Sequence, residues 1–204
     1  MTSSSRSPSK VWLYLSGIVA TLVTMAIVAL CADMYITHKK MNDMDDMATS
    51  MNTVIEASGH YIRDHHDALA DQRQKVRIVT ISGQTLQDNG YLPAGFSLDN
   101  PWHQHFQLNV THDPKTPSRL TAFVLTTGGK PVQPGEALFI SNKIDQGGAI
   151  IMANEVFTVD EPDSQEIRLK DYDVSGQQGH LFAWVPDDGL TSGGKFPAAG
   201  DLKP

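Results

Sequence analysis

Two scarcities in the sequence narrow the class of protein. Cysteine occurs once among 204 residues, at Cys31. No disulfide can form within one chain, so a domain outside the cytoplasm must be held together by its apolar core alone. Charged side chains are missing from Val11 to Ala32. This run is about as long as the roughly 20 apolar residues that cross a bilayer as a helix.

Basic residues are also few, with 16 Lys and Arg against 23 Asp and Glu, and the formal net charge is −7. A nucleic-acid-binding domain would need a basic stripe, so we expect no nucleic-acid partner. The sequence contains no G-x-S-x-G, H-E-x-x-H, phosphate-binding loop or C-x-x-C motif. We therefore expect no enzyme, no catalytic residue, no cofactor and no small-molecule substrate.

The histidines do not predict a metal site. His60 and His65 are five positions apart in a predicted helix, so they face different directions and are interpreted as solvated side chains. His103 and His105 would share one face of a strand, and a metal there would need further ligands, from His112 or His180. We expect no metal ligands in this chain.

The uncharged run continues into a polar segment with helical periodicity, and no proline or turn cluster separates the two. We predict one long helix, transmembrane over residues 11–32 and amphipathic over residues 33–76. Its stripe must be covered either by the rest of the chain or by another helix. The stripe residues, three or four apart, are Met41, Met44, Ala48, Met51, Ile55, Ser58, Ile62, His65 and Leu69.

The remainder of the chain predicts mostly antiparallel strands with small helices between them. Ser82 or Thr85 could cap a short helix, and Pro134 is expected to begin one that runs to about Ile144. The order of elements indicates an α+β fold in which a small antiparallel sheet lies on the long helix, the shape of a pilin. The predicted strands are His105–His112, Leu120–Thr127, Ile150–Phe157, Glu166–Leu169 and Gly179–Val185.

Five segments follow from this reading. They are a disordered cytoplasmic stub (1–10), the transmembrane helix (11–32), its amphipathic extension (33–76), a pilin-like head (77–189) and a loose tail (190–204).

Two basic residues lie on each side of the apolar run, so the positive-inside rule does not decide its orientation. A short stub before a large polar domain is the usual layout of a signal anchor, which favours a cytoplasmic N-terminus. The run is longer than the apolar region of a cleaved signal peptide, about 7–15 residues. Leu30 is not the small residue that precedes a lipidated cysteine, so Cys31 is interpreted as a small apolar side chain.

An ordered set of short motifs resembles the constant region of shufflon-type minor pilins of type IVb pili. The resemblance extends from about Ala20 to Gly189 and implies a pilin-like fold at or near the tip of a thin pilus. In conjugative systems of that family, the tip protein selects the recipient cell through a variable C-terminal segment. The motifs are Ala20–Leu30, Tyr61–Asp64, Gly90–Ser97, Leu125–Gly129, Gly147–Gly148 and Gly179–Leu181.

Two departures from the family pattern affect this expectation. Pilin precursors carry a glycine before the cleavage site and a glutamate at the fifth mature position. If Ala20 stands at the place of the glutamate, Leu15 takes that of the glycine; counting from Gly17 instead puts Leu22 at the fifth position. Neither register provides an acid. About fifteen residues follow Gly189, so we also expect no large variable segment.

These features predict a type IVb pilin-like structural subunit of a pilus, conjugation or secretion apparatus, which acts in assembly or in cell-surface contact. It would be a minor pilin, either retained in the membrane or entering the pilus. It would cross the bacterial inner membrane once, with a cytoplasmic N-terminus and a periplasmic head, and would contact other pilin or pilus-assembly subunits. The alternative is a membrane-anchored periplasmic scaffold or sensor whose stripe pairs with a partner membrane protein.

Overall fold

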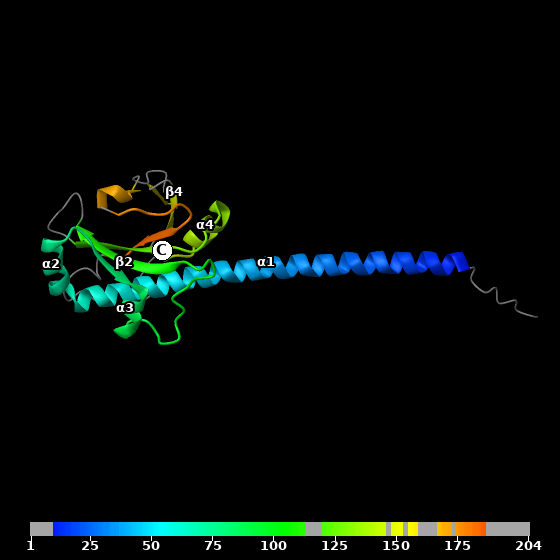
Figure 1. Ribbon diagram of the computed structural model, residues 1–204, viewed down its shortest axis with the longest axis horizontal. Helices are drawn as coiled ribbons and strands as arrows, with labels where there is room; N and C mark the ends of the chain where they lie inside the picture. The colour runs from blue at the N-terminus through cyan, green and yellow to red at the C-terminus, as the bar shows by residue number, and fades with distance from the viewer. Residues whose placement is uncertain are drawn as a thin grey trace, which may run out of the picture. The chain divides into compact units, whose positions relative to one another are not determined.

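The computed structural model describes residues 10–112, 120–145, 148–152, 155–158, 167–172 and 174–186. The chain separates into two units, residues 1–42 and residues 43–204, and the first helix belongs to both (Figure 1). Apart from Lys10, the predicted stub of residues 1–10 lies outside the described residues, as does the predicted tail of residues 190–204.

Helix α1 (Lys10–Asp64) runs without interruption from the apolar stretch into the polar one. Its large apolar side chains from Trp12 to Ile36 are between 53% and 74% exposed where they are described. A helix satisfies its own backbone polar groups, as a segment in lipid must. Among the described residues, α1 is the one helix long and apolar enough to cross a membrane, judged by length and composition.

The structure divides the predicted continuous helix near its end. Helix α1 ends at Asp64, and α2 (His66–Lys75) begins after one residue. That residue, His65, has φ −113° and ψ 16°. Its backbone N–H, at 3.1 Å, and its ring Nδ1, at 3.0 Å, both contact the carbonyl oxygen of Tyr61. A side chain that contacts its own helix backbone competes with helical geometry, and periodicity does not reveal such competition.

Two shorter helices follow the predicted pattern. The hydroxyl of Ser82 accepts a 3.1 Å hydrogen bond from the N–H of Thr85 and caps α3 (Gly83–Asp88). Helix α4 (Pro134–Ser141) begins at the predicted proline and ends before Ile144.

The strands form one sheet in which every neighbouring pair is antiparallel. The sheet has seven strands within the described part of the chain, in the order β1-β2-β3-β7-β4-β5-β6. The last strand therefore lies in the middle of the sheet. The strands are β1 (Val79–Ser82), β2 (His105–His112), β3 (Leu120–Thr127), β4 (Gly148–Met152), β5 (Glu155–Thr158), β6 (Ile167–Arg168) and β7 (Leu181–Trp184).

The strand predictions at β2 and β3 are confirmed residue for residue. The predicted single strand Ile150–Phe157 is wrong, because β4 and β5 form an antiparallel pair in which Ile150 lies opposite Phe157. Asn154 and Glu155 interrupt the apolar residues of this segment, and this interruption is the sequence signal for two strands in place of one. The predicted strand Glu166–Leu169 is wrong at its last residue, because the 3-10 helix η1 (Leu169–Tyr172) follows β6 directly. Glu166 lies outside the described residues.

Side chains are buried on both faces of the sheet. Alternation along β3 places Val124 in the cluster beneath α1 and Phe123 in a cluster on the opposite face. Figure 1 shows α1 lying lengthwise along the sheet within the second unit. The predicted α+β, pilin-like arrangement is therefore confirmed. The buried members of the second cluster are Phe123, Leu125, Ala149, Ile151, Val156, Leu169 and Phe182.

Candidate functional site

The apolar stripe of α1 is covered by the chain's own sheet. Met47, Met51 and Ile62 have no exposed surface and belong to the same buried cluster as Leu108 of β2. Packing beneath the sheet, one of the two arrangements considered for the stripe, is therefore the one observed. Met41 differs, because it lies in the first unit and is 45% exposed.

The buried face is wider than the predicted stripe. Met47, Val54 and Ala57 are also buried, at 0%, 0% and 4% exposure. Each lies three residues after another buried residue of α1. These positions therefore form a second row of apolar residues beside the predicted stripe, and this second row is visible in the sequence. The wider face gives the sheet a broad apolar surface to pack on rather than a narrow seam.

A polar clamp joins α1 to the segment after α4. The side-chain amide of Asn52 donates to the carbonyl of Lys143 (3.1 Å) and accepts from the N–H of Asp145 (3.1 Å). The ammonium group of Lys143 also pairs with the carboxylate of Asp45 and lies 4.5 Å from the ring centre of Phe139. The pair between Lys143 and Asp45 is about half exposed, so we ascribe the positioning to the amide of Asn52.

The end of α1 contacts the loop after α3 through a polar and aromatic cluster. The phenol of Tyr91 donates to Asp64 (2.8 Å), and its ring meets Tyr61 edge-on at 5.3 Å. The ring of His65 stacks on Tyr61 at 4.3 Å. Burial raises the pKa of Tyr91 to about 12, and its hydrogen bond to Asp64 acts in the same direction. The prediction of a freely solvated His65 is wrong, because the ring is part of this cluster.

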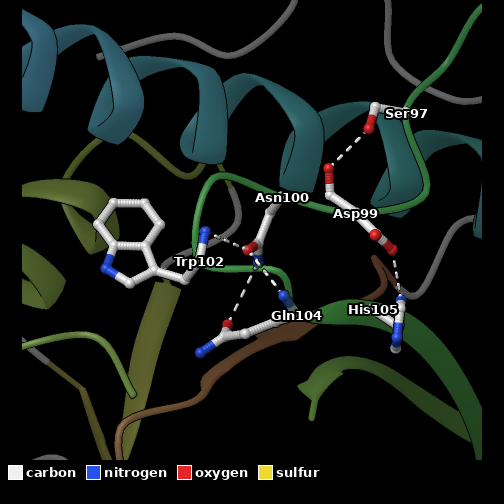
Figure 2. A network of polar contacts seen from close by, with 6 residues as sticks. All are labelled: Ser97, Asp99, Asn100, Trp102, Gln104 and His105. Atoms are coloured by element: carbon white, nitrogen blue, oxygen red, sulfur yellow. Dashed lines mark hydrogen bonds and ion pairs between the residues drawn. The ribbon is translucent and has the colours of Figure 1, made fainter. Parts of the chain in front are cut away.

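Asn100 organises the turn before β2 (Figure 2). Its Oδ1 accepts hydrogen bonds from the N–H groups of Trp102 (2.9 Å) and Gln104 (3.0 Å), and its Nδ2 donates to Oε1 of Gln104 (3.2 Å). Asn100 is 4% exposed, and Gln104 is fully buried. On the outer side of the turn, Asp99 and His105 form an exposed pair at 2.6 Å. The polar atoms of this buried amide pair are satisfied by hydrogen bonds, as buried polar groups require.

Gln104 connects this turn to two other segments. Its Nε2 donates to the carbonyl of Lys130 (2.7 Å) and contacts that of Gly179 (3.3 Å). The N–H of Lys130 in turn donates to the carbonyl of Trp102 (2.9 Å). We call the three segments, residues 100–104, 126–132 and 176–181, the loop junction. Two of the resembling motifs, Leu125–Gly129 and Gly179–Leu181, overlap the junction, but nothing in the sequence indicates the role of Gln104, because a buried amide has no pattern of its own.

The glycines of the resembling motifs are required by this geometry. Gly129 and Gly179 have φ values of 61° and 77°, which glycine adopts at little cost. A Cβ at Gly129 would overlap the backbone of His103, and one at Gly179 would lie 2.5 Å from the Cβ of Pro131. His103 itself has φ 59°. These backbones are therefore close enough that only a hydrogen atom fits between them.

The start of β7 is held by hydrogen bonds from several segments. The N–H of Leu181 donates to the hydroxyl of Thr126 (2.9 Å), and Nε2 of His180 lies 2.6 Å from the carbonyl oxygen of Gly128. The N–H of Gly179 donates to the carbonyl of Ile151 (2.9 Å). Because a carbonyl oxygen can only accept, Nε2 of His180 is assigned as the protonated nitrogen.

The remaining candidate residues do not assemble into a chemical site. His103 lies in the turn rather than on the strand, so it does not share a strand face with His105 as predicted. Within the described ranges, no three His, Cys, Asp or Glu side chains are placed to hold a metal ion. Asn109 begins an Asn-Val-Thr triplet but is 1% exposed, and its Oδ1 accepts from Thr80 (3.1 Å). The triplet is therefore structural and not a modification site.

A groove of about 270 Å³ lies beside the loop junction. Its lining offers neither an acid, a base nor a nucleophile, so its chemistry is limited to packing and amide hydrogen bonds. The lining residues are Pro131, Val132, Gln133, Pro134, Ile150, Met152, Gln178 and Gly179.

Comparison with known proteins identifies the family in which these features occur together. Residues 35–196 match the family model described as bacterial shufflon protein, N-terminal constant region. The chain belongs to this family. The matched range contains the stripe of α1 beneath the sheet, the Tyr91–Asp64 contact and the loop junction. The shufflon family is a structural pilus component and not an enzyme family, which confirms the expectation that the chain is no enzyme.

Curated shufflon proteins of Escherichia coli are similar to the chain at low identity. Shufflon protein A', shufflon protein B and shufflon protein A are each 23% identical over 181 residues, or 88% of this chain. The alignments cover 42%, 41% and 38% of those proteins, so the chain spans about two fifths of the length of the relatives it matches. No solved structure matches the chain.

Proposed function

We propose that this chain is a type IVb pilin-like structural subunit, a minor pilin retained in the membrane, of a pilus, conjugation or secretion apparatus. The observation that carries the proposal is the difference in exposure between the two parts of α1. Its first part exposes apolar side chains over residues 12–36, while its second part is buried beneath the sheet. An apolar helix without a cover needs lipid or other apolar helices around it, and both exist where pilin subunits meet in a membrane.

The anchor crosses the inner membrane once, with the N-terminus in the cytoplasm and the head in the periplasm. No acidic side chain occurs between Val11 and Ala32, although an intramembrane acid is the feature expected of a processed, polymerising pilin. The subunit therefore remains attached through an unprocessed helix and contacts other pilin or assembly subunits from there. It acts in pilus assembly or in contact between cells.

Although the sequence predicts no large variable segment after Gly189, the head would support a C-terminal segment of whatever length follows Pro186. The relatives are longer than this chain, and the family model describes an N-terminal constant region. Strand β7 ends two residues before Pro186, from where a following segment would begin. The alternative, a scaffold whose stripe pairs with a partner membrane helix, is not favoured because Met47, Met51 and Ile62 are already buried under the sheet.

Mass measurement of the chain recovered from cell membranes tests the anchor. A full-length N-terminus is expected. A mature N-terminus near Ser16 or Ile18 would show that processing occurs and would overturn membrane retention.

Complementation of a deletion strain tests the wider role. A variant lacking residues 1–42 keeps the whole second unit, and it should fail to restore pilus formation or transfer between cells. Restoration by this soluble head, at the level of the full chain, would contradict the proposal. A full chain with Cys31→Ser serves as the matched control, because it changes the anchor only by one small side chain.

A further inference from the structure

The last strand of the chain is also the central strand of its sheet. Strand β7 lies between β3 and β4, with Phe123 opposite Trp184 on one side and Ile150 opposite Leu181 on the other. The chain leaves this strand through Val185, whose N–H donates to the carbonyl of Ala122 (2.9 Å). Anything attached beyond Pro186 is thus attached to the middle of the sheet and not to an edge.

The two ends of β7 differ in how they are held. Its exit carries the single further bond from Val185, whereas its start lies in the loop junction. There, residues 179–181 are bonded to Gln104, Thr126, Gly128, Val132 and Ile151, which come from three separate stretches of chain. The strand is therefore fixed most firmly at the end away from its exit.

The direction of a pull decides how these bonds are loaded. Hydrogen bonds between antiparallel strands are perpendicular to the strand axis. A force along β7 consequently strains all of its ladder bonds together, while a force across the sheet would open them one after another. Figure 1 shows α1 lying lengthwise along the sheet. Trp102 of the loop junction packs against the buried cluster that contains Met47 and Met51 of α1. Because β7 begins in the loop junction, Pro186 leaves from the opposite end of the strand.

We propose that β7 is the load-bearing strand of the head, which transmits tension from a segment attached after Pro186 through the loop junction to α1. This inference rests on the proposed function, since tension arises only if the chain is anchored by α1 and engaged beyond β7. A subunit that contacts another cell while anchored in a membrane is pulled in this direction. Entry of the load at the sheet centre protects the short edge strand β6 (Ile167–Arg168) from being peeled away.

Single-molecule force measurements on the full chain in detergent micelles test the proposal. In a Cys31→Ser background, one pair of handles is attached at cysteines replacing Asn42 and Pro186, which pulls along β7. A second pair at cysteines replacing the exposed residues Thr80 of β1 and Arg168 of β6 pulls across the sheet, perpendicular to its strands. The rupture force along β7 should be at least about twofold higher, because several bonded pairs carry the load at once rather than one. Equal forces on the two axes would overturn the proposal.

A matched pair of substitutions on β3 tests the role of the loop junction. Thr126→Val removes the acceptor of the Leu181 N–H, whereas Thr121→Val makes the same change away from the junction. The first should lower the rupture force along β7, and the second should leave it unchanged. Equal effects of the two would overturn the role of the junction. The comparison of axes in the unsubstituted head stands even if Thr126→Val fails to fold.

The measurement also separates this inference from the proposed function. It concerns the isolated chain and does not depend on pilus assembly. A high rupture force together with a processed N-terminus in cells would retain the load-bearing strand and reject membrane retention. Equal forces together with an unprocessed N-terminus would reject the load-bearing strand and retain the membrane-retained subunit.

Discussion

The phenol of Tyr91 donates a 2.8 Å hydrogen bond to the carboxylate of Asp64, 27 residues earlier in the chain. The contact joins the C-terminal end of α1 to the loop after α3. It brings together two of the short motifs on which the resemblance to shufflon-type pilins is based, Tyr61–Asp64 and Gly90–Ser97. Each motif is weak in the sequence, but in the fold they form the two sides of one contact.

This contact predicts an alkaline loss of stability. The pKa of Tyr91 is raised to about 12 in the folded chain, mainly by burial and then by Asp64, against 10.0 for an unperturbed tyrosine. The folded state therefore keeps the proton longer than the unfolded state. The contribution to the free energy of unfolding is present in full below pH 10 and is lost as the pH rises towards 12.

Urea unfolding of the full chain between pH 9 and pH 12 measures this loss. The same series on Tyr91→Phe is subtracted from it, because all other groups titrate alike in the two proteins. The variant should be less stable than the natural chain by about 0.5–1.5 kcal/mol at neutral pH, the usual net value of a hydrogen bond. The difference should shrink above pH 10. Tyr35→Phe, at a residue 70% exposed, is the control and should show no such convergence. A constant difference across the whole range would contradict the prediction.

Some parts of this fold follow from local rules, and others do not. Strand β2 was predictable because apolar and polar residues alternate along it, and β3 because it is rich in β-branched and aromatic residues. The cap at Ser82 was predictable because its hydroxyl acts over three residues. The place of β7 between β3 and β4 was not predictable, because pairing of distant strands leaves no periodic mark. The same holds for the buried amide of Gln104, whose partners lie 26 and 75 residues away.

Burial of the α1 face predicts a contrast between two methionines. Met51 is fully buried beneath the sheet, so Met51→Ala should lower the free energy of unfolding by about 2–5 kcal/mol through lost burial and the cavity left behind. Met41→Ala, at a residue 45% exposed, should change it by less than about 0.5 kcal/mol. Chemical unfolding of both variants in the same detergent measures the contrast. Equal losses would show that the stripe is not packed as described.

The close approach of backbones in the loop junction predicts a second contrast. Gly129→Ala combines a φ of 61° with an overlap between the new Cβ and the backbone of His103. The positive φ alone should cost about 1–2 kcal/mol, and the overlap adds to it. Gly95→Ala is the matched control, because a Cβ there meets nothing within 4 Å. Unfolding midpoints should fall only for Gly129→Ala. A similar fall for Gly95→Ala would point to a general effect of removing glycine.

The central position of the last strand predicts that the sheet cannot form without it. A chain that ends at Gln178 lacks β7, which leaves β1, β2 and β3 separated from β4, β5 and β6. Both buried clusters lose members, because Leu181 and Ala183 belong to the cluster beneath α1 and Phe182 to the opposite one. The backbone groups of β3 and β4 that bond to β7 would also become unpaired edges, which favour aggregation.

Limited proteolysis of the truncated chain in detergent micelles checks this expectation, with a chain ending at Pro186 as the control that keeps every described strand. The control should resist cleavage in its head, and the shorter chain should be cut within β3 and β4. A synthetic peptide of residues 178–186 added in trans should restore resistance, because it supplies the missing ladder partners on both sides. Protection of the shorter chain without the peptide would mean that the two half-sheets are stable alone. Strand β7 would then be an addition to the head and not its centre.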